Sequence, residues 1–357
     1  MEDMLMSKIE ITSQIANYEV EFITSYKHML ENVMLEGDVI LIDSKVKQIY
    51  KDSFDLILND SNCIEIDSSE SVKSYQGIIP IIQDLIGRNF KRNNKLIAVG
   101  GGITQDVVAF TASVLYRGVT WYFFPTTLLA QGDSCIGSKT SINFVNYKNL
   151  IGGFYPPKKI YLDPVFLKSL SDIEIRSGLG EMLHYFVVSG KDDFIFFKNN
   201  YERAITNDGA MLALISRSLQ IKKKYVELDE FDTGIRQIFN YGHSFGHALE
   251  SIFKYQLPHG IAVSFGIDIA NYISMRAGFL SESVLKDVRL VVNDLHSDFS
   301  IKDLDIDQFL LALQKDKKNE GSKLGLILLS GFGEAFKHLI EPDVKFQVWL
   351  KEYFKSL

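Results

Sequence analysis

The sequence has few of the residues that mark secreted, membrane-bound or linker-rich proteins. Its 357 residues include only 2 Cys and 7 Pro, too few for a disulfide framework or for long proline-rich linkers. No run approaches the roughly 18 consecutive apolar residues that a membrane-spanning helix needs. The start, Met1-Glu2-Asp3-Met4, has neither a basic nor an apolar segment, so we expect no signal peptide and a cytoplasmic protein.

Positive charge and histidine are also scarce. The 38 Lys+Arg against 45 Asp+Glu give a net charge of −7, which argues against general binding to nucleic acid or to anionic membranes. There are only 7 His, yet His184, His243, His247 and His259 fall within one stretch of the second half. Because histidine is the residue best suited to metal binding and proton transfer, this stretch is the first candidate site.

The arrangement of apolar residues predicts two domains, as the length suggests. Over residues 8–150, β-rich runs at 8–11, 39–42, 63–66, 95–99 and 121–124 are separated by helical patterns such as 71–90. This alternation indicates βαβ units and a largely parallel sheet. From about Leu167, helical patterns dominate, over 173–189, 210–228, 237–253, 263–277 and 306–313. We therefore expect an α/β domain with a parallel-rich, Rossmann-like sheet over 1–166 and a mainly α-helical domain over 167–357.

A glycine-rich turn, Gly100-Gly101-Gly102, follows one of the β-rich runs and precedes a helical pattern. Glycines there let the backbone approach a ligand and aim helix N–H groups at a phosphate. Gln105 stands where the dinucleotide fingerprint needs a third glycine. The pattern alone therefore leaves a phosphate-binding turn and an ordinary tight turn both open. Asp43, at the end of an earlier β-rich run, is placed where a carboxylate can accept from a ribose hydroxyl.

His243 and His247 are four residues apart, so a helix places both imidazoles on one face. Two ordinary surface or core histidines are the alternative, since Ser244 breaks the H-E-x-x-H pattern. His259 and Glu181 add to the pair a set of N and O donors that suits Zn²⁺ or a similar divalent ion.

Basic residues near this stretch suggest an anionic ligand. Arg236 and Lys222 lie just upstream of the histidines, and if they face inward they suit a carboxylate and a phosphate better than nucleic acid. The alternative, solvated surface lysines, holds for most of the 38 basic residues.

These motifs together resemble the 3-dehydroquinate synthases of the sugar phosphate cyclase superfamily, over nearly the whole chain. The resemblance runs in order through Gly100–Asp106, Tyr116–Val119, Pro125–Ser134, Lys139-Thr140, Lys148–Gly152, Arg176–Glu181, Asn240–Glu250, His259-Gly260 and Asp316–Lys318.

The resemblance implies a role for each matching position. The metal ligands would be Glu181, His243 and His259, holding Zn²⁺ or Co²⁺. The contacts to NAD would be Asp43, Glu70, Lys73, Gly101, Gly102, Asp106, Thr126, Thr127 and Lys148. Asp133 and Lys139 would meet the substrate hydroxyls, and Lys222 and Arg236 its carboxylate. The substrate phosphate would lie among Lys139, Asn149, Asn240, His247, Lys317 and Lys318. Arg117 resembles an arginine lent to the neighbouring subunit, which implies a homodimer.

The reaction implied is a cyclisation in which NAD⁺ takes a hydride and later returns it, with loss of phosphate in between. Lys222 and Arg236 favour a keto-acid phosphate of the shikimate pathway. The alternatives are an aminodehydroquinate, 2-deoxy-scyllo-inosose or valiolone-type synthase, a metal-dependent polyol dehydrogenase of the glycerol dehydrogenase type, and a non-catalytic relative that binds NAD or a sugar phosphate.

The chain departs from the family pattern at four positions: His184 in place of Lys, Ser138 and Tyr147 in place of Gly, and Lys45 in place of Asn. His184 lies one helical turn after Glu181 and is also a candidate catalytic residue. The pKa of an imidazole is about 6.5 and that of a lysine about 10.4. A side chain that is always charged near neutral pH is therefore replaced by one whose charge depends on pH.

Overall fold

The structure, a computed structural model, describes residues 8–145, 147–296, 299–302, 304–315 and 319–357. The chain divides into two compact units. The N-terminal unit comprises residues 1–170 and 215–231, and the C-terminal unit comprises residues 171–214 and 232–357. The expected domain boundary between residues 166 and 167 stays a prediction.

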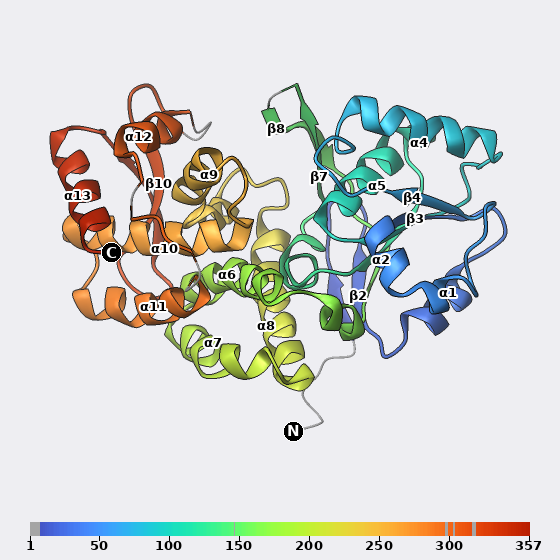
Figure 1. Cartoon of the computed structure of the whole chain (residues 1–357), viewed down its shortest axis with the longest axis horizontal. Helices are drawn as coiled ribbons and strands as arrows, with labels where there is room; N and C mark the ends of the chain where they lie inside the picture. The colour runs from blue at the N-terminus through green and yellow to red at the C-terminus, as the bar shows by residue number, and fades with distance from the viewer. Residues whose placement is uncertain (1–7, 146, 297–298, 303, 316–318) are drawn as a thin grey trace. The chain divides into compact units, whose positions relative to one another are not determined.

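A seven-stranded sheet forms the centre of the N-terminal unit, in the order β1-β2-β9-β6-β5-β3-β4 (Figure 1). Its strands are β1 (Lys8–Ile11), β2 (Tyr18–Phe22), β3 (Val39–Asp43), β4 (Cys63–Ile66), β5 (Leu96–Gly100), β6 (Trp121–Pro125) and β9 (Lys159–Leu162). Only the β1–β2 pair is antiparallel, and the other pairings are parallel. The expected parallel-rich sheet is confirmed.

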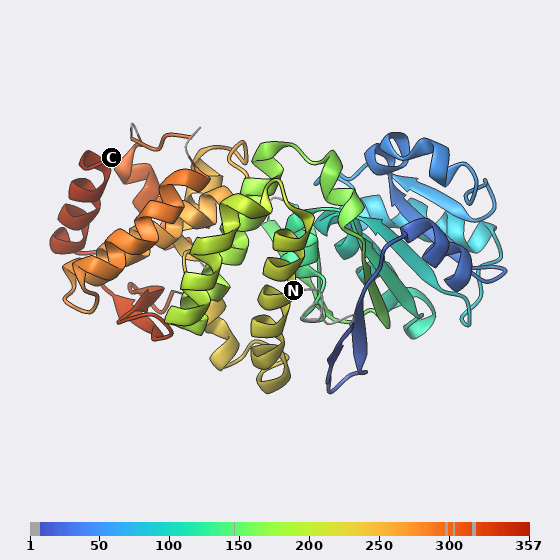
Figure 2. The same cartoon turned by 90° about the horizontal axis from the view of Figure 1, so that it is seen from below.

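Burial explains why the central strands are continuous apolar runs. All five residues of β5 and the first four of β3 are buried, as in parallel sheets covered by helices on both faces. The β1–β2 hairpin lies instead at the edge of the sheet and extends past the other strands (Figure 2).

The helices of this unit are α1 (Tyr26–Val33), α2 (Ser44–Ile49), α3 (Lys51–Phe54), α4 (Tyr75–Gly87) and α5 (Gly102–Val114), with the later part of α8 (Asp208–Leu228). The short turns η2 (Leu115–Arg117), η3 (Ala130–Ser134) and η4 (Pro164–Ser169) follow α5, β6 and β9, respectively. The helix expected over 71–90 begins only at Tyr75, because the Ser74 hydroxyl caps it by accepting from the Gly77 N–H.

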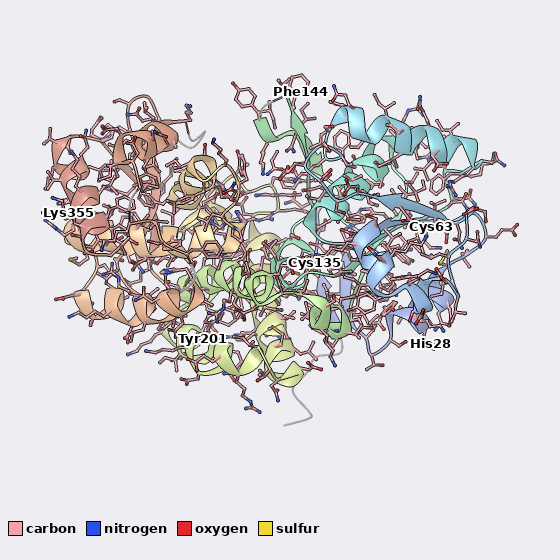
Figure 3. All side chains as sticks on the ribbon, viewed as in Figure 1. His28, Cys63, Cys135, Phe144, Tyr201 and Lys355 are labelled. Carbon is pink, nitrogen blue, oxygen red and sulfur yellow. The ribbon has the colours of Figure 1, made fainter. Side chains whose placement is uncertain are left out.

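A separate antiparallel hairpin, β7 (Lys139–Phe144) and β8 (Tyr147–Phe154), also belongs to the N-terminal unit. Its end is apolar and exposed at Phe144, which Figure 3 labels. Cys63 and Cys135 are both free thiols at well separated places in the same unit (Figure 3).

Helices make up most of the C-terminal unit, as expected. They are α6 (Asp172–Ser189), α7 (Lys191–Ala204), the start of α8, α9 (His243–Ile252), α10 (His259–Arg276), α11 (Glu282–Leu295), α12 (Ile306–Gln314) and α13 (Val344–Lys355), with the turn η5 (Ile235–Asn240). One antiparallel hairpin, β10 (Leu324–Leu329) with β11 (Ala335–Ile340), is added to them. Within the described residues, no helix combines the length and the apolar character required to cross a membrane.

Helix α10 is the core of this unit. Fourteen of its residues, from Gly260 to Ser274, are buried, which is typical of a helix surrounded by others. Helices α6, α9, α11 and α13 and strand β10 all pack against it. The first residue of α10, His259, is thereby anchored at the most constrained element of the unit.

The single helix expected over 237–253 is wrong. The chain instead forms η5, turns at Tyr241-Gly242 and begins α9 at His243. Gly242 has a φ of 82°, a left-handed conformation that a regular helix does not allow. The turn places His243 in the first turn of its own helix.

Candidate functional site

Three side chains from three helices of the C-terminal unit converge. Glu181 comes from α6, His243 from the start of α9 and His259 from the start of α10. The Nε2 atom of His243 lies 3.3 Å from Oε1 of Glu181, and Nε2 of His259 lies 3.3 Å from Oε2. One donor atom from each residue lies within 4.8 Å of the others. Two imidazoles and one carboxylate form a donor set that binds Zn²⁺ in catalytic sites.

Glycines at the helix crossings let these ligands meet. A Cβ on Gly260 of α10 would lie 1.7 Å from the Ser177 carbonyl oxygen of α6. A Cβ on Gly266 would lie 1.9 Å from the Gly242 carbonyl oxygen, which immediately precedes α9. Only glycine at these positions allows backbones so close, and the close approach brings Glu181, His243 and His259 into one group.

The second ring nitrogen of His243 and of His259 also faces an oxygen. Nδ1 of His243 lies 3.3 Å from the Tyr241 carbonyl oxygen, and Nδ1 of His259 lies 3.3 Å from Oε2 of Glu250. Such contacts fix which ring nitrogen carries the proton in metal-ligating histidines. They leave Nε2 of both rings directed at Glu181.

The charges suit a divalent cation. Burial alone would raise the pKa of Glu181, but the facing imidazoles of His243 and His259 hold it well below its usual value. Burial alone would lower the pKa of His259, but Glu181 and Glu250 raise it well above its usual value. Among the described residues, Oε2 of Glu181 is buried and accepts no hydrogen bond. A buried ionised carboxylate with an unused oxygen, facing two imidazoles, fits a metal ion.

His184 packs against this group. Its Nδ1 atom is hydrogen-bonded to the Glu181 carbonyl oxygen and lies 4.0 Å from Oε1 of the same residue. His184 is 1% exposed, and the centroid of its ring lies 3.8 Å from that of the Tyr185 ring. The plane of its ring makes an angle of 90° with that of His243. The sequence placed His184 on the Glu181 face of a helix, and the structure brings the two residues together there.

Three more predicted residues belong to the same unit. Arg236 is 4% exposed in η5. Asn240, at the end of η5, donates from Nδ2 to the Gln237 carbonyl oxygen at 3.0 Å. The ring of His247 is exposed, 5.6 Å from that of His243, on the same helix face as the sequence predicted. The predicted phosphate residues Lys317 and Lys318 lie outside the described residues.

The glycine turn of the N-terminal unit connects β5 to α5, as expected. Gly101 caps α5 without any side chain, so the first N–H groups of the helix are not covered by a capping side chain. A Cβ on Gly101 would lie 2.9 Å from the Thr127 methyl group, whereas a Cβ on Gly102 would have nothing within 4 Å. The Thr126 N–H donates to the Gly100 carbonyl oxygen at 2.9 Å, which holds this segment against the turn. An exposed helix N-terminus of this kind attracts phosphate.

Four of the charged residues predicted to contact NAD form two pairs, Lys73 with Asp106 and Lys148 with Glu70. Lys73, 8% exposed, is paired with Asp106, which also accepts from the Ser141 N–H at 3.0 Å. Burial raises the pKa of Asp106, and Lys73 opposes that rise.

Lys148 donates to Glu70 at 2.6 Å, and Asn143 donates to the other oxygen of the same carboxylate at 2.6 Å. Although burial favours the neutral acid, these two bonds hold the pKa of Glu70 below its usual value. Both pairs therefore attach the β7–β8 hairpin to the parts of the chain that carry Glu70, Lys73 and Asp106, which are predicted to contact NAD. Asp43 ends β3, and its Oδ1 caps α2 by accepting from the Lys45 and Val46 N–H groups.

Lys222 and Asp133 form a nearly buried pair. Nζ of Lys222 donates to Oδ1 and to the carbonyl oxygen of Asp133, both at 2.7 Å. Asp133 lies in η3, a π-helical turn, an irregularity frequent at functional sites. Lys139 begins β7 with an exposed side chain.

Two further predicted residues have left-handed backbones. Asn149, with a φ of 53°, accepts from the Ser141 hydroxyl at 3.0 Å. Arg117, with a φ of 63°, projects from the exposed turn η2 after α5. The N-terminal unit therefore holds Asp133, Lys139, Asn149 and Lys222, whereas Arg236, Asn240 and His247 belong to the C-terminal unit.

Sequence reasoning assigned no role to Glu250 or Asn143. Glu250 lies seven residues after His243 and three after His247, a spacing that places all three on one helix face. That spacing was a usable signal for Glu250. Asn143 had no comparable signal, because its contact with Glu70 depends on how β7 folds back.

Two family models match the chain. Residues 63–177 match the 3-dehydroquinate synthase N-terminal family and residues 178–319 the 3-dehydroquinate synthase C-terminal family. The 3-dehydroquinate synthase of Francisella tularensis is 34% identical over 345 residues, covering 92% of this chain and 94% of that one.

Solved structures share the fold. A 2-deoxy-scyllo-inosose synthase, complexed with carbaglucose-6-phosphate, NAD⁺ and Co²⁺, superposes with a TM-score of 0.85 at 21% identity, covering 98% of this chain and 99% of that one. The 2-epi-5-epi-valiolone synthase of Streptomyces hygroscopicus, with NAD⁺ and Zn²⁺ bound, has a TM-score of 0.81 at 24% identity, covering 98% and 99%. The fold is therefore that of the sugar phosphate cyclases. Within that class, the chain belongs to the 3-dehydroquinate synthase family.

Proposed function

We propose that the chain catalyses the cyclisation of 3-deoxy-D-arabino-heptulosonate 7-phosphate to 3-dehydroquinate with release of phosphate. This is a carbon–oxygen lyase reaction of the shikimate pathway, on the route to aromatic amino acids. The observation that carries the proposal is the Glu181, His243 and His259 group in a chain that is 34% identical to a 3-dehydroquinate synthase over 92% of its length.

Two cofactors are part of the proposal. NAD⁺, when bound, would accept a hydride from a substrate hydroxyl carbon and, as NADH, return it to the substrate later in the same turnover, so that the cofactor ends unchanged. Zn²⁺ or Co²⁺, held by Glu181, His243 and His259, supplies Lewis-acid polarisation of a substrate oxygen. The relatives with NAD⁺ and a metal bound support both assignments.

The NAD site is proposed at the glycine turn of the N-terminal unit. The helix α5 N-terminus at Gly101-Gly102 would face the pyrophosphate, with Thr126 and Thr127 beside it. Asp43 would accept from a ribose hydroxyl through the carboxylate oxygen that does not cap α2. The paired residues Lys73 with Asp106 and Glu70 with Lys148 would hold the hairpin against the cofactor.

The substrate carboxylate is assigned to Lys222 and Arg236. Both are buried cations, at 6% and 4% exposure, and a buried cation binds a carboxylate strongly because little solvent screens the pair. Asp133, already bonded to Lys222, would accept from a substrate hydroxyl with Lys139 alongside. A sugar phosphate that lacks a carboxylate has no group for Lys222 and Arg236 to bind.

The phosphate group is assigned to Lys139, Asn149, Asn240, His247, Lys317 and Lys318, with Arg117 from a second subunit of a homodimer. The exposed, left-handed turn that carries Arg117 supports its reaching a neighbouring chain. His184 contacts the metal-site residue Glu181 through its Nδ1 atom.

The proposal is tested with a panel of sugar phosphates, NAD⁺ and Zn²⁺, with phosphate release as the assay. We expect the seven-carbon keto-acid phosphate to have the highest kcat/KM, well above glucose 6-phosphate and sedoheptulose 7-phosphate. A neutral sugar phosphate turned over faster than the keto-acid phosphate contradicts the assignment. That result would instead support an inosose- or valiolone-type cyclase marked by His184.

A further inference from the structure

Both ring nitrogens of His259 face carboxylates. Its Nε2 lies 3.3 Å from Oε2 of Glu181, and its Nδ1 lies 3.3 Å from Oε2 of Glu250. The Glu181 side is the proposed metal centre. The Glu250 side is not used by any step assigned so far, although the Glu250 side chain is only 14% exposed.

Helix packing holds Glu250 in place. It lies on α9, two turns after His243, so the same face of one helix carries a metal ligand and Glu250. Gly266 of α10 packs against Gly242, which immediately precedes α9, and against Gly246 of α9, and this keeps the two helices in close contact. The position of Glu250 relative to His259 is therefore set by the same crossing that sets the position of His243.

We propose that Glu250 is a positioning residue of the metal centre, which orients His259 by accepting a hydrogen bond from its Nδ1–H. The bond holds the imidazole in the tautomer whose Nε2 lone pair faces Glu181 and His243. The carboxylate also raises the electron density on the ring, which makes Nε2 a stronger donor to a metal. This inference deepens the proposed function and rests on its metal centre.

The two ligand histidines are oriented by different groups, for a physical reason. His243 is 13% exposed, and the Tyr241 carbonyl, fixed in the backbone, faces its Nδ1. His259 is 34% exposed, so its ring has more freedom to rotate and more access to water. A charged acceptor binds an N–H more strongly than a neutral one, and that stronger bond compensates for the exposure.

His247, Glu250 and His259 also place donor atoms within 4.8 Å of one another, so a second ion at this group is the competing interpretation. A neutral imidazole has one lone pair and one N–H. An ion on Nδ1 of His259 would require the ring either to turn its Nε2 away from Glu181 or to lose its one N–H proton and become an imidazolate. The hydrogen-bonded arrangement needs neither change, which favours Glu250 as a positioning residue.

The test compares Zn²⁺ binding by the full chain in four forms: wild type, Glu250→Ala, Glu250→Gln and, as a control, Glu282→Gln. Glu282 is an exposed glutamate of α11, 2.8 Å from Lys286. Stoichiometry is measured by elemental analysis and affinity by competition with a chromophoric chelator. The Co²⁺-substituted forms are compared by visible absorption.

We expect one Zn²⁺ per chain in all four forms and about 10- to 100-fold weaker binding in Glu250→Ala. Glu250→Gln keeps an oxygen acceptor without the charge, so its loss should be smaller, with a shifted Co²⁺ spectrum. Glu282→Gln should bind like the wild type. If Glu250→Ala does not fold, Glu250→Gln, which keeps the shape of the side chain, decides the question.

Zn²⁺ affinity unchanged in both Glu250 variants would overturn the inference. So would two ions per wild-type chain falling to one in Glu250→Ala, since that result makes Glu250 a ligand. A wild-type chain that binds no Zn²⁺ would contradict the metal centre, and with it the proposed function.

Discussion

Replacing Gly260 by alanine tests whether the helix crossing positions the metal ligands. The new Cβ would lie 1.7 Å from the Ser177 carbonyl oxygen, whereas ordinary contacts begin at 3.4 Å. Helices α6 and α10 must therefore separate by about 1.7 Å at this point, the difference between those two distances. Ser177 lies one turn before Glu181, and Gly260 adjoins His259, so the separation moves two ligands apart.

The expected effects are large. A metal site tolerates deviations of only about 0.2 Å in its ligand distances, so a displacement several times larger should abolish tight binding. Overpacking a core typically costs about 1–3 kcal/mol of unfolding free energy. We expect Gly260→Ala to lose at least that much and to bind Zn²⁺ more than about 100-fold more weakly, which corresponds to about 2.7 kcal/mol.

Urea unfolding of the metal-free protein and chelator competition measure the two effects separately. Gly87→Ala is the matched control, because a Cβ at that helical glycine has nothing within 4 Å. Alanine is favoured over glycine in helices by up to about 1 kcal/mol, so the control should be as stable as the wild type or slightly more stable. Gly260→Ala with wild-type unfolding free energy and Zn²⁺ affinity would refute the reasoning.

Three other predictions concern charge and metal. Arg236→Ala should raise KM for the keto-acid phosphate about 10- to 100-fold, since hydrogen bonds to charged groups contribute about 1.5–3 kcal/mol. Steady-state kinetics measure this KM. An unchanged KM would contradict the assignment of Arg236 to the substrate carboxylate. Removing the metal with a chelator should abolish phosphate release, and added Zn²⁺ or Co²⁺ should restore it; full activity after verified metal removal would contradict the metal's role. Burial against the Phe265 ring lowers the pKa of His296 to about 4 from 6.5. Because the unfolded chain binds the proton first as pH falls, stability should drop between pH 6.5 and 4, by about 2 kcal/mol from pH 7 to pH 5. Urea unfolding of His296→Leu should show a correspondingly smaller drop, and an equal drop would count against this explanation.

The sheet was predictable where strands are buried on both faces. Strands β3 and β5 are continuous apolar runs because helices cover them. Strand β2 was missed, although the alternation of Tyr18, Val20 and Phe22 with Glu19 and Glu21 is the pattern of a half-buried strand. Glu19 pairs on the sheet surface with Lys8 of the neighbouring strand β1 and with Lys159 of β9, and only β9 comes from a distant part of the chain.

The β7–β8 hairpin could not be predicted from local pattern. Most of β8 is exposed and contains Gly152 and Gly153, so it lacks the apolar alternation of a half-buried strand. Its position depends on long-range contacts, of Asp106 with the Ser141 N–H and of Glu70 with Lys148.

The candidate site was predictable in part. The four-residue spacing placed His243 and His247 on one face, and the structure has both on α9. The spacing did not show that Gly242 would end the preceding turn and start a new helix. Nor did it show that Glu181 and His259 would meet His243, because that depends on which glycines face each other at the α6–α10 and α9–α10 crossings.

The central claim is a redox-neutral, metal-dependent cyclisation of a keto-acid phosphate. The most direct measurement follows phosphate release and absorbance at the NADH wavelength together, with Zn²⁺-loaded protein and only one NAD⁺ per active site. We predict many phosphates released per NAD⁺ with no accumulation of NADH, because each hydride is returned within its turnover. Phosphate release that stops after one equivalent, or NADH that rises in step with turnover, would contradict the account.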